Sequence, residues 1–254
     1  MFFEILKGCL IPFLGTTLGA ACVLFVKGGL GARSRSAFAA FAAGVMAAAS
    51  VWSLIIPAID ASAYMGKLSF LPCVVGFFIG IFFLLTCDAL DAAVRQASGR
   101  ARDKNGMLLL AVTIHNIPEG MAVGAVFAAL AQGSVGIGLL EAMALSVGIA
   151  IQNFPEGAIV SMPLRASGMG RWKSFFFGAL SGAVEPVAAF LTVLLADILV
   201  PVIPYLLGFA AGAMIYAVAV ELIPEMWEGD IPKVWVMFFA LGFALMMTLD
   251  VTLG

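Results

Sequence analysis

The sequence predicts an all-α integral membrane protein that crosses the bilayer eight times. Of the 254 residues, 63% are hydrophobic and only 11% are charged, whereas soluble domains average roughly 45–50% and 25%. The hydrophobic residues fall into eight runs, each close to the ~20 residues that a helix needs to cross a bilayer. Because the connections between runs are short, we expect residues 1–254 to form a single polytopic transmembrane domain.

The eight runs follow one another with little interruption. They cover approximately residues 5–26, 37–59, 70–94, 107–131, 136–163, 173–197, 201–224 and 232–252. The first run lacks the basic segment and the cleavage motif of a signal peptide, so we interpret it as a membrane span. Since eight is an even number, both termini should lie on the same side of the membrane.

The basic residues predict which side that is. Eleven of the 13 Lys and Arg residues lie on the odd-numbered connections, and only Lys7 and Lys67 lie on the other side. Cytoplasmic loops of membrane proteins are enriched in Lys and Arg. We therefore assign the odd connections to the cytoplasm and both termini to the extracytoplasmic side.

Runs four and five carry the same six-residue signature, [H/Q]-N-[I/F]-P-E-G, at residues 115–120 and 152–157. In each copy the Glu follows the opening His or Gln by one helical turn, so the two side chains share a helix face. A charged residue at the bilayer centre costs about 2.5–3.5 kcal/mol on insertion scales. Glu119 and Glu156 therefore indicate a functional site within the membrane.

Run six adds a third carboxylate, Glu185, next to Pro186. Three carboxylates inside the membrane require cations or protons, and either one or two divalent ions would balance most of the charge. A mixture of imidazole, amide and carboxylate groups suits a borderline metal such as Zn²⁺ or Fe²⁺ better than Ca²⁺ or Na⁺. The alternatives are a polar network that only joins three helices, and a proton relay without metal.

A weaker repeat relates runs two and seven. Ala-Ala-Gly-Val-Met at residues 42–46 is echoed by Ala-Ala-Gly-Ala-Met at 210–214, and seven residues later Ser53-Leu-Ile is echoed by Glu221-Leu-Ile. In the predicted topology both repeated pairs run in opposite directions. That arrangement is typical of inverted repeats, which place transporter sites near the membrane midplane. Chance recurrence of small-residue packing motifs is the alternative for runs two and seven.

These motifs resemble the Zrt/Irt-like (ZIP) family of divalent-metal transporters, in its bacterial branch. The resemblance extends over essentially all eight runs and also rests on Glu185-Pro186 and on Glu221-Leu-Ile-Pro-Glu225. It implies a 3+2+3 helix arrangement, a metal centre with one or two ions halfway across the membrane, and uptake toward the cytoplasm. It further implies a homodimer in the inner (plasma) membrane.

The resemblance also implies two metal positions that share Glu119 and Glu156 as bridging ligands. The first position would use His115, Glu119, Gln152 and Glu156, with Met46 beside it, and the second would use Asn116, Glu119, Asn153, Glu156 and Glu185. Asn153 stands where the nearest family pattern has Asp, which removes a charge and should weaken the second position. The transported metal would be Zn²⁺, with Cd²⁺, Fe²⁺ and Mn²⁺ left open.

Polar residues nearer the ends of the runs suggest a pathway. On the outer side, Ser53 shares a helix face with Met46 and Asp60 by its spacing, although Asp60 is equally well explained as a solvated helix end. On the cytoplasmic side, the candidates for metal release are Asp88, Asp91, Glu221 and Glu225. Asp250 in the last run favours a packing or interfacial role.

Two other functions remain open at this point: a proton-coupled transporter of an organic solute, and an intramembrane metalloenzyme. Hydrolytic zinc sites use several His or Cys ligands and keep a position for water, whereas this chain has one His and no H-E-x-x-H motif. We therefore expect no enzyme activity. No basic cluster is interleaved with aromatic residues, so we expect no nucleic-acid partner. The partners should be the lipid bilayer and metal ions.

Overall fold

The computed structural model describes residues 2–25, 31–98, 104–133, 138–195, 202–227 and 233–253. These residues form helices joined by short turns and contain no β-strand. Eight of the helical segments among them are long and apolar enough to cross a membrane. The prediction of an all-α membrane protein with eight spans is therefore confirmed.

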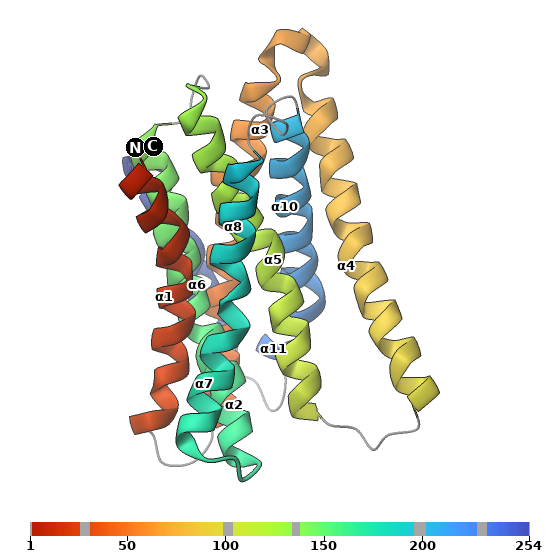
Figure 1. Ribbon diagram of the computed structural model, residues 1–254, viewed down its shortest axis with the longest axis vertical. Coiled ribbons are helices and arrows are strands. Elements are labelled where there is room, and N and C mark those ends of the chain that lie inside the picture. Colours follow the sequence, from red (N-terminus) through yellow and green to blue (C-terminus); the bar gives the residue numbers. More distant parts are fainter. Residues whose placement is uncertain are drawn as a thin grey trace.

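The spans follow the predicted runs to within a few residues. In chain order they are α1 (Phe2–Phe25); α2 (Ala32–Ala49), η1 (Ser50–Ile55) and α3 (Ile56–Ala61); α4 (Phe70–Ser98), preceded by η2 (Ala63–Leu68); α5 (Lys104–Ala131); α6 (Leu139–Ala166); α7 (Arg171–Gly182) and α8 (Val184–Leu194); α10 (Ile203–Ala217), η4 (Val218–Leu222) and α11 (Ile223–Met226); and α12 (Trp235–Leu253). Both termini lie at the same end of the molecule (Figure 1), as an even number of spans requires.

The helices pack in pairs that mirror one another. α1 packs along α6 and α5 along α8, while α4 packs along α10 and α12 along α2. If the first three spans repeat as the last three in inverted orientation, α1–α6 corresponds to α8–α5, and α4–α10 corresponds to α12–α2. The packing follows the pairing that such a repeat requires, and the 3+2+3 arrangement itself stays a prediction.

The second and seventh spans also share a backbone irregularity. Each changes from α-helix to π-helix four residues after the Met that closes the repeated motif, at Ser50 and at Val218. Each returns to α-helix with a proline in the first turn, Pro57 or Pro224, which cannot donate a backbone hydrogen bond. The weak sequence similarity of these two spans therefore extends to their backbone geometry, and single π-turns of this kind are frequent at functional sites.

The glycine of each signature copy allows another backbone to approach. A Cβ atom on Gly120 would lie 2.3 Å from the carbonyl oxygen of Glu185 in α8, and one on Gly157 would lie 2.1 Å from the carbonyl oxygen of Thr16 in α1. Only glycine fits at such distances, which is how small residues bring membrane helices together. The two signature helices are thereby held against α8 and α1.

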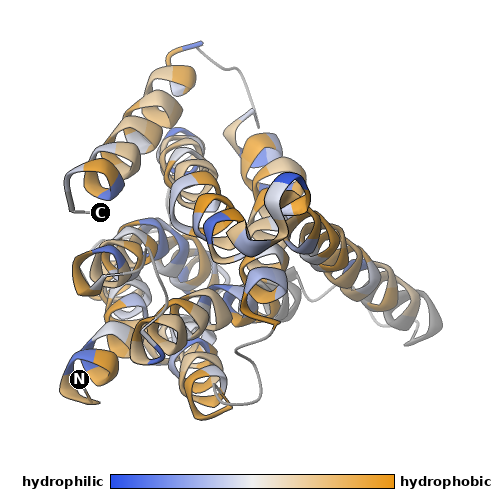
Figure 2. Cartoon of the chain, turned by 90° about the horizontal axis from the view of Figure 1, so that it is seen from above, coloured by the Kyte–Doolittle hydropathy of each residue, from blue (hydrophilic) through white to orange (hydrophobic). Residues whose placement is uncertain are grey.

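The outward faces of the bundle are apolar. Hydrophobic residues cover the outside of the peripheral helices, including the C-terminal helix α12 (Figure 2). On α4, the side chains of Phe78, Ile79 and Phe82 are exposed. Such faces suit contact with lipid acyl chains, whereas the polar side chains described next lie inside the bundle.

Candidate functional site

The two signature carboxylates lie halfway along their helices. Glu119 belongs to α5 and Glu156 to α6, and both helices continue unbroken through the prolines of the signature. The Glu119 side chain is only 1% exposed, whereas Glu156 is partly exposed.

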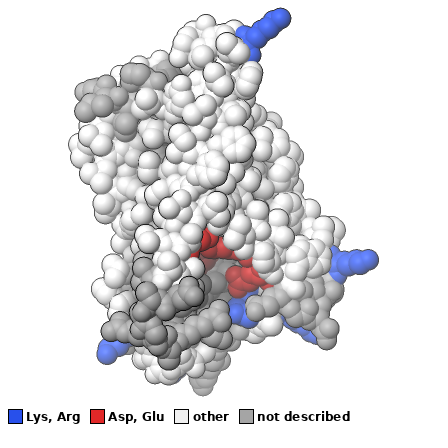
Figure 3. Space-filling model, turned by 90° about the vertical axis from the view of Figure 1, so that its right-hand side faces the viewer, with Lys and Arg blue, Asp and Glu red and all other residues white. Residues whose placement is uncertain are grey.

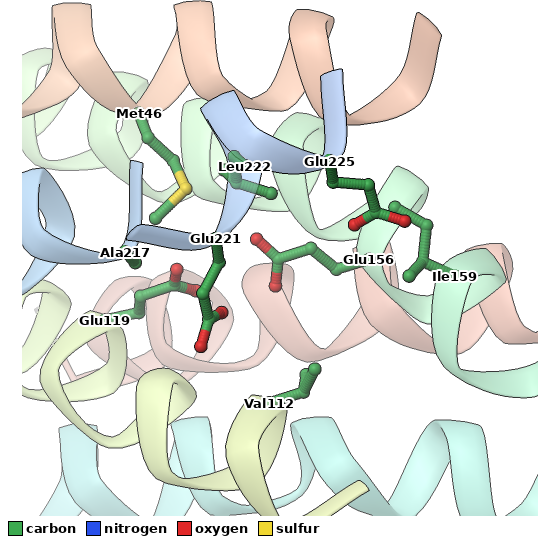
Figure 4. A pocket seen from close by; sticks show the side chains of 9 residues that line it. All are labelled: Met46, Val112, Glu119, Glu156, Ile159, Ala217, Glu221, Leu222 and Glu225. Atoms are coloured by element: carbon green, nitrogen blue, oxygen red, sulfur yellow. The ribbon is translucent and has the colours of Figure 1, made fainter. Parts of the chain in front are cut away.

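Both carboxylates border a cavity of about 60 Å³, which we call the acidic cavity. Its lining residues are Met46, Val112, Glu119, Glu156, Ile159, Ala217, Glu221, Leu222 and Glu225. Figure 4 shows the carboxylates of Glu119, Glu156 and Glu221 directed into the same space, with the Met46 thioether nearby. A water molecule needs roughly 10–15 Å³ of such volume, so an ion with a few waters fits.

A hollow on one side of the molecule contains acidic side chains. In the space-filling view, acidic side chains lie at the floor of a hollow in the half of the molecule away from the termini (Figure 3). In the predicted topology this half faces the cytoplasm.

Glu185 belongs to a separate and closed group of side chains. It is fully buried, and its Oε1 atom accepts hydrogen bonds from Thr16 Oγ1 at 2.9 Å and Asn116 Nδ2 at 3.1 Å. Its Oε2 atom accepts one from Asn153 Nδ2 at 2.8 Å. Burial of a carboxylate is tolerated only when it is paired or hydrogen-bonded, and three donors meet that need here. We call Thr16, Asn116, Asn153 and Glu185 the amide cluster.

Gln152, which directly precedes Asn153 in the chain, contacts a cavity residue, because its Nε2 atom donates to Glu119 Oε1 at 2.9 Å. Four buried oxygen atoms of this region accept no hydrogen bond from the described residues: Asn116 Oδ1, Glu119 Oε2, Gln152 Oε1 and Asn153 Oδ1. All four are acceptors, and unpaired buried acceptors are costly. A cation with oxygen ligands would satisfy them, so the residues present fit a metal as cargo.

The structure thus divides the predicted metal ligands between two groups. Met46, Glu119 and Glu156 border the acidic cavity, whereas Asn116, Asn153 and Glu185 form the closed cluster. His115 lies in α5, and its side chain is outside the described residues. Among the side chains that are described, no three His, Cys, Asp or Glu residues come close enough together to hold a metal ion by themselves.

On the side predicted to face outward, the structure brings together two residues that lie in different helices. Ser53 Oγ in η1 donates to Asp250 Oδ1 in α12 at 2.6 Å. Asp250 is therefore bonded to Ser53, which the sequence placed on the pathway. Its own sequence position favoured a packing or interfacial role. No spacing within one helix could reveal this pair. Asp60, near the end of α3, is exposed, which fits either explanation offered for it.

On the inner side, two of the predicted release residues lie closer to the signature than expected. Glu221 and Glu225 border the same cavity as Glu119. Asp88 is not among the lining residues, and it accepts a hydrogen bond from Tyr216 Oη at 2.7 Å, which joins α4 to α10. The side chain of Asp91 lies outside the described residues.

Comparison with known proteins gives consistent results. A family model described as ZIP zinc transporter matches residues 91–250. The zinc transporter ZIP11 of Xenopus tropicalis is 34% identical, over 98% of this chain and 97% of that protein. The zinc transporter GufA of Myxococcus xanthus is 34% identical over 98% of both chains. The zinc transporter ZIPB of Bordetella bronchiseptica is 35% identical, over 95% of this chain and 79% of that protein.

Proposed function

This chain belongs to the ZIP family of zinc transporters, and from that premise we propose that it carries divalent transition-metal cations, zinc foremost, toward the cytoplasm. Proteins of this family are transporters and not enzymes, which excludes the intramembrane metalloenzyme. The observation that carries the proposal is the acidic cavity, since it joins one carboxylate from each signature copy. An organic solute would not explain why four carboxylates line so small a space.

We propose that the first metal position is formed by Glu119 and Glu156 with Gln152, Met46 and, from the sequence, His115. Two carboxylates balance the charge of one divalent ion. A thioether and an imidazole favour borderline and soft metals such as Zn²⁺ and Cd²⁺ over Mg²⁺ and Ca²⁺. Fe²⁺ and Mn²⁺ are further candidates for cargo.

The second metal position would add Asn116, Asn153 and Glu185 to the shared carboxylates. Glu185 already accepts three hydrogen bonds, which occupy most of the roughly four acceptor sites of a carboxylate, so a second ion competes with these donors. Amide oxygens are also weaker ligands than carboxylates for a borderline metal. The second position should therefore fill only at higher metal concentration and tune the rate or selectivity of transport.

The proposed pathway runs from Asp60 and Ser53 past Met46 to the shared carboxylates, and then to the cytoplasm by way of Glu221 and Glu225. Asp88 would act beyond them. The cavity lies where two groups of helices meet: α5 and α6 carry the signature carboxylates, while α2 and η4 carry Met46 and Glu221. Movement of one group against the other would open the cavity to alternate sides, as inverted-repeat transporters do.

Metal uptake into proteoliposomes tests the proposal. Purified protein should give saturable Zn²⁺ uptake that Cd²⁺ inhibits at comparable concentration, with Mn²⁺ and Fe²⁺ weaker and Ca²⁺ and Mg²⁺ without effect. Uptake that does not saturate, or that Ca²⁺ inhibits equally well, would contradict it. The mass of the detergent-solubilised protein would show whether it forms the homodimer that the family resemblance implies.

Orientation in the plasma (inner) membrane is tested separately. In a background without native cysteines, Lys67→Cys should react with an impermeant maleimide added outside intact cells, and Arg33→Cys should react only after the cells are opened. Both positions are exposed and lie on opposite sides in the predicted topology. The reverse labelling pattern would reverse the proposed direction of transport.

A further inference from the structure

Thr16 is a residue to which the sequence assigns no role, yet it lies at the amide cluster. Its side chain is fully buried in α1. It is held between two glycines: a Cβ atom on Gly182 would lie 2.7 Å from Thr16 Oγ1, and one on Gly157 would lie 2.1 Å from the Thr16 carbonyl oxygen. This close packing fixes the direction of the hydroxyl, which donates to Glu185 Oε1 at 2.9 Å.

Thr16 differs from the other two donors to Glu185. Asn116 and Asn153 each donate an amide N–H to the carboxylate and leave a carbonyl oxygen without a partner. By turning over, either amide can present oxygen to a cation in place of N–H. A hydroxyl carries its donor and its oxygen on one atom, so Thr16 does not have to turn over and can donate to Glu185 whether or not a cation is bound.

This difference matters because a carrier must also cross the membrane without cargo. In that step no metal lies at Glu119 and Glu156, beside the amide cluster, to offset the Glu185 charge, and an uncompensated carboxylate in a dry interior is strongly unfavourable. Hydrogen bonds to a charged group are stronger than those between neutral groups. The donors to Glu185 are therefore the groups that lower the free-energy cost of the unloaded step.

We propose that Thr16 is a positioning residue for the return of the unloaded site: its hydroxyl, together with Asn116 and Asn153, stabilises the Glu185 carboxylate in the step in which no cation does so. The inference rests on the proposed transport function and deepens it. Net uptake includes the return of the unloaded site, whereas exchange of metal for metal does not. The inference therefore predicts that substitution of Thr16 slows net uptake more than it slows exchange.

The test compares the two fluxes in proteoliposomes. Thr16→Val keeps the side-chain shape and removes the hydroxyl, and it should slow net Zn²⁺ uptake about tenfold while labelled-metal exchange, with Zn²⁺ on both sides, stays within about twofold. Thr16→Ser should restore net uptake because it restores the donor. Thr17→Val is the matched control, since its neighbouring hydroxyl has no hydrogen-bond partner, and it should change neither flux.

A second variant shows whether Thr16 acts through the Glu185 charge. In a Glu185→Gln background, adding Thr16→Val should not slow net uptake further, because residues that act through one interaction are not additive. An equal loss of net uptake and exchange in Thr16→Val, or an undiminished effect of Thr16→Val in the Glu185→Gln background, would overturn the inference alone. Absence of saturable uptake and exchange in the unaltered protein would overturn the proposed function itself.

Discussion

The amide cluster and the acidic cavity are neighbours and both contain carboxylates, but the surroundings of these carboxylates differ. Glu185 is fully buried and accepts three hydrogen bonds. Glu156 is partly exposed to the cavity, and no described side chain donates to it. A carboxylate that accepts several hydrogen bonds from neighbouring helices holds those helices together, whereas one that faces a cavity is available to a cation.

Glu119 stands between the two regions and shares properties of both. One of its oxygens accepts a hydrogen bond from Gln152, and the other has no partner. Two of the three membrane carboxylates therefore offer free oxygen atoms on the cavity side. Variants of each region should separate binding of the cargo from support of the binding site.

The largest effect is expected in the acidic cavity. Glu119→Gln and Glu156→Gln should each lower saturable Zn²⁺ uptake about a hundredfold or more, because each removes half of the charge that balances the ion. Uptake into proteoliposomes measures this, with size-exclusion profiles to show that the variants fold. Glu4→Gln is the control, since Glu4 pairs with Lys7 at the surface. Normal transport by either cavity variant would show that the shared carboxylates are misassigned.

A smaller effect is expected when the amide cluster is converted to a second acidic group. Asn153→Asp replaces a donor that lies 2.8 Å from Glu185 Oε2 with a second carboxylate. Without metal, repulsion should lower the melting temperature by several degrees, and Zn²⁺ should raise it more than in the unaltered protein, since ligand binding stabilises the folded state. Metal titration by mass spectrometry should then detect a second bound ion.

The control for that experiment is the double variant Asn153→Asp with Glu185→Gln. Because it has only one carboxylate in the cluster, the repulsion should disappear and the melting temperature should recover. Equal stability of Asn153→Asp and the unaltered protein without metal would mean that the two side chains do not face each other.

A smaller effect is expected from a change in the backbone contact between Gly120 and Glu185, which positions the amide cluster. Gly120→Ala would place a methyl group 2.3 Å from the Glu185 carbonyl oxygen, and overpacking of this kind costs about 1–3 kcal/mol. A lower melting temperature and a modest loss of uptake are expected. Gly31→Ala would place its methyl group near no described residue and should behave like the unaltered protein. Equal stability of the two variants would argue against close contact of α5 and α8.

The smallest effect is expected at the outer end of the pathway. Ser53→Ala removes the hydrogen bond to Asp250 and should raise the KM for Zn²⁺ a few-fold with little change in the maximal rate, since the transport site is untouched. Ser50→Ala is the matched control, because its hydroxyl donates only to the Met46 carbonyl of its own helix. A change in maximal rate without a change in KM would contradict a role in metal entry.

The sequence by itself determined the spans and the residues of the signature. A run of apolar residues long enough to cross a bilayer has one stable outcome, because the backbone must satisfy its hydrogen bonds within a helix. The repeated signature predicted a functional role for Glu119 and Glu156, since a charge inside the membrane is costly.

Only the tertiary structure decided how those residues divide into two regions. Periodicity assigns a side chain to a helix face, but the rotation and separation of neighbouring helices are set by backbone contacts such as those at Gly120 and Gly157. These contacts bring Thr16 to Glu185 across 169 positions and Ser53 to Asp250 across 197. Which oxygen meets a donor and which faces the cavity is a property of that packing, so no pattern along one helix contains it.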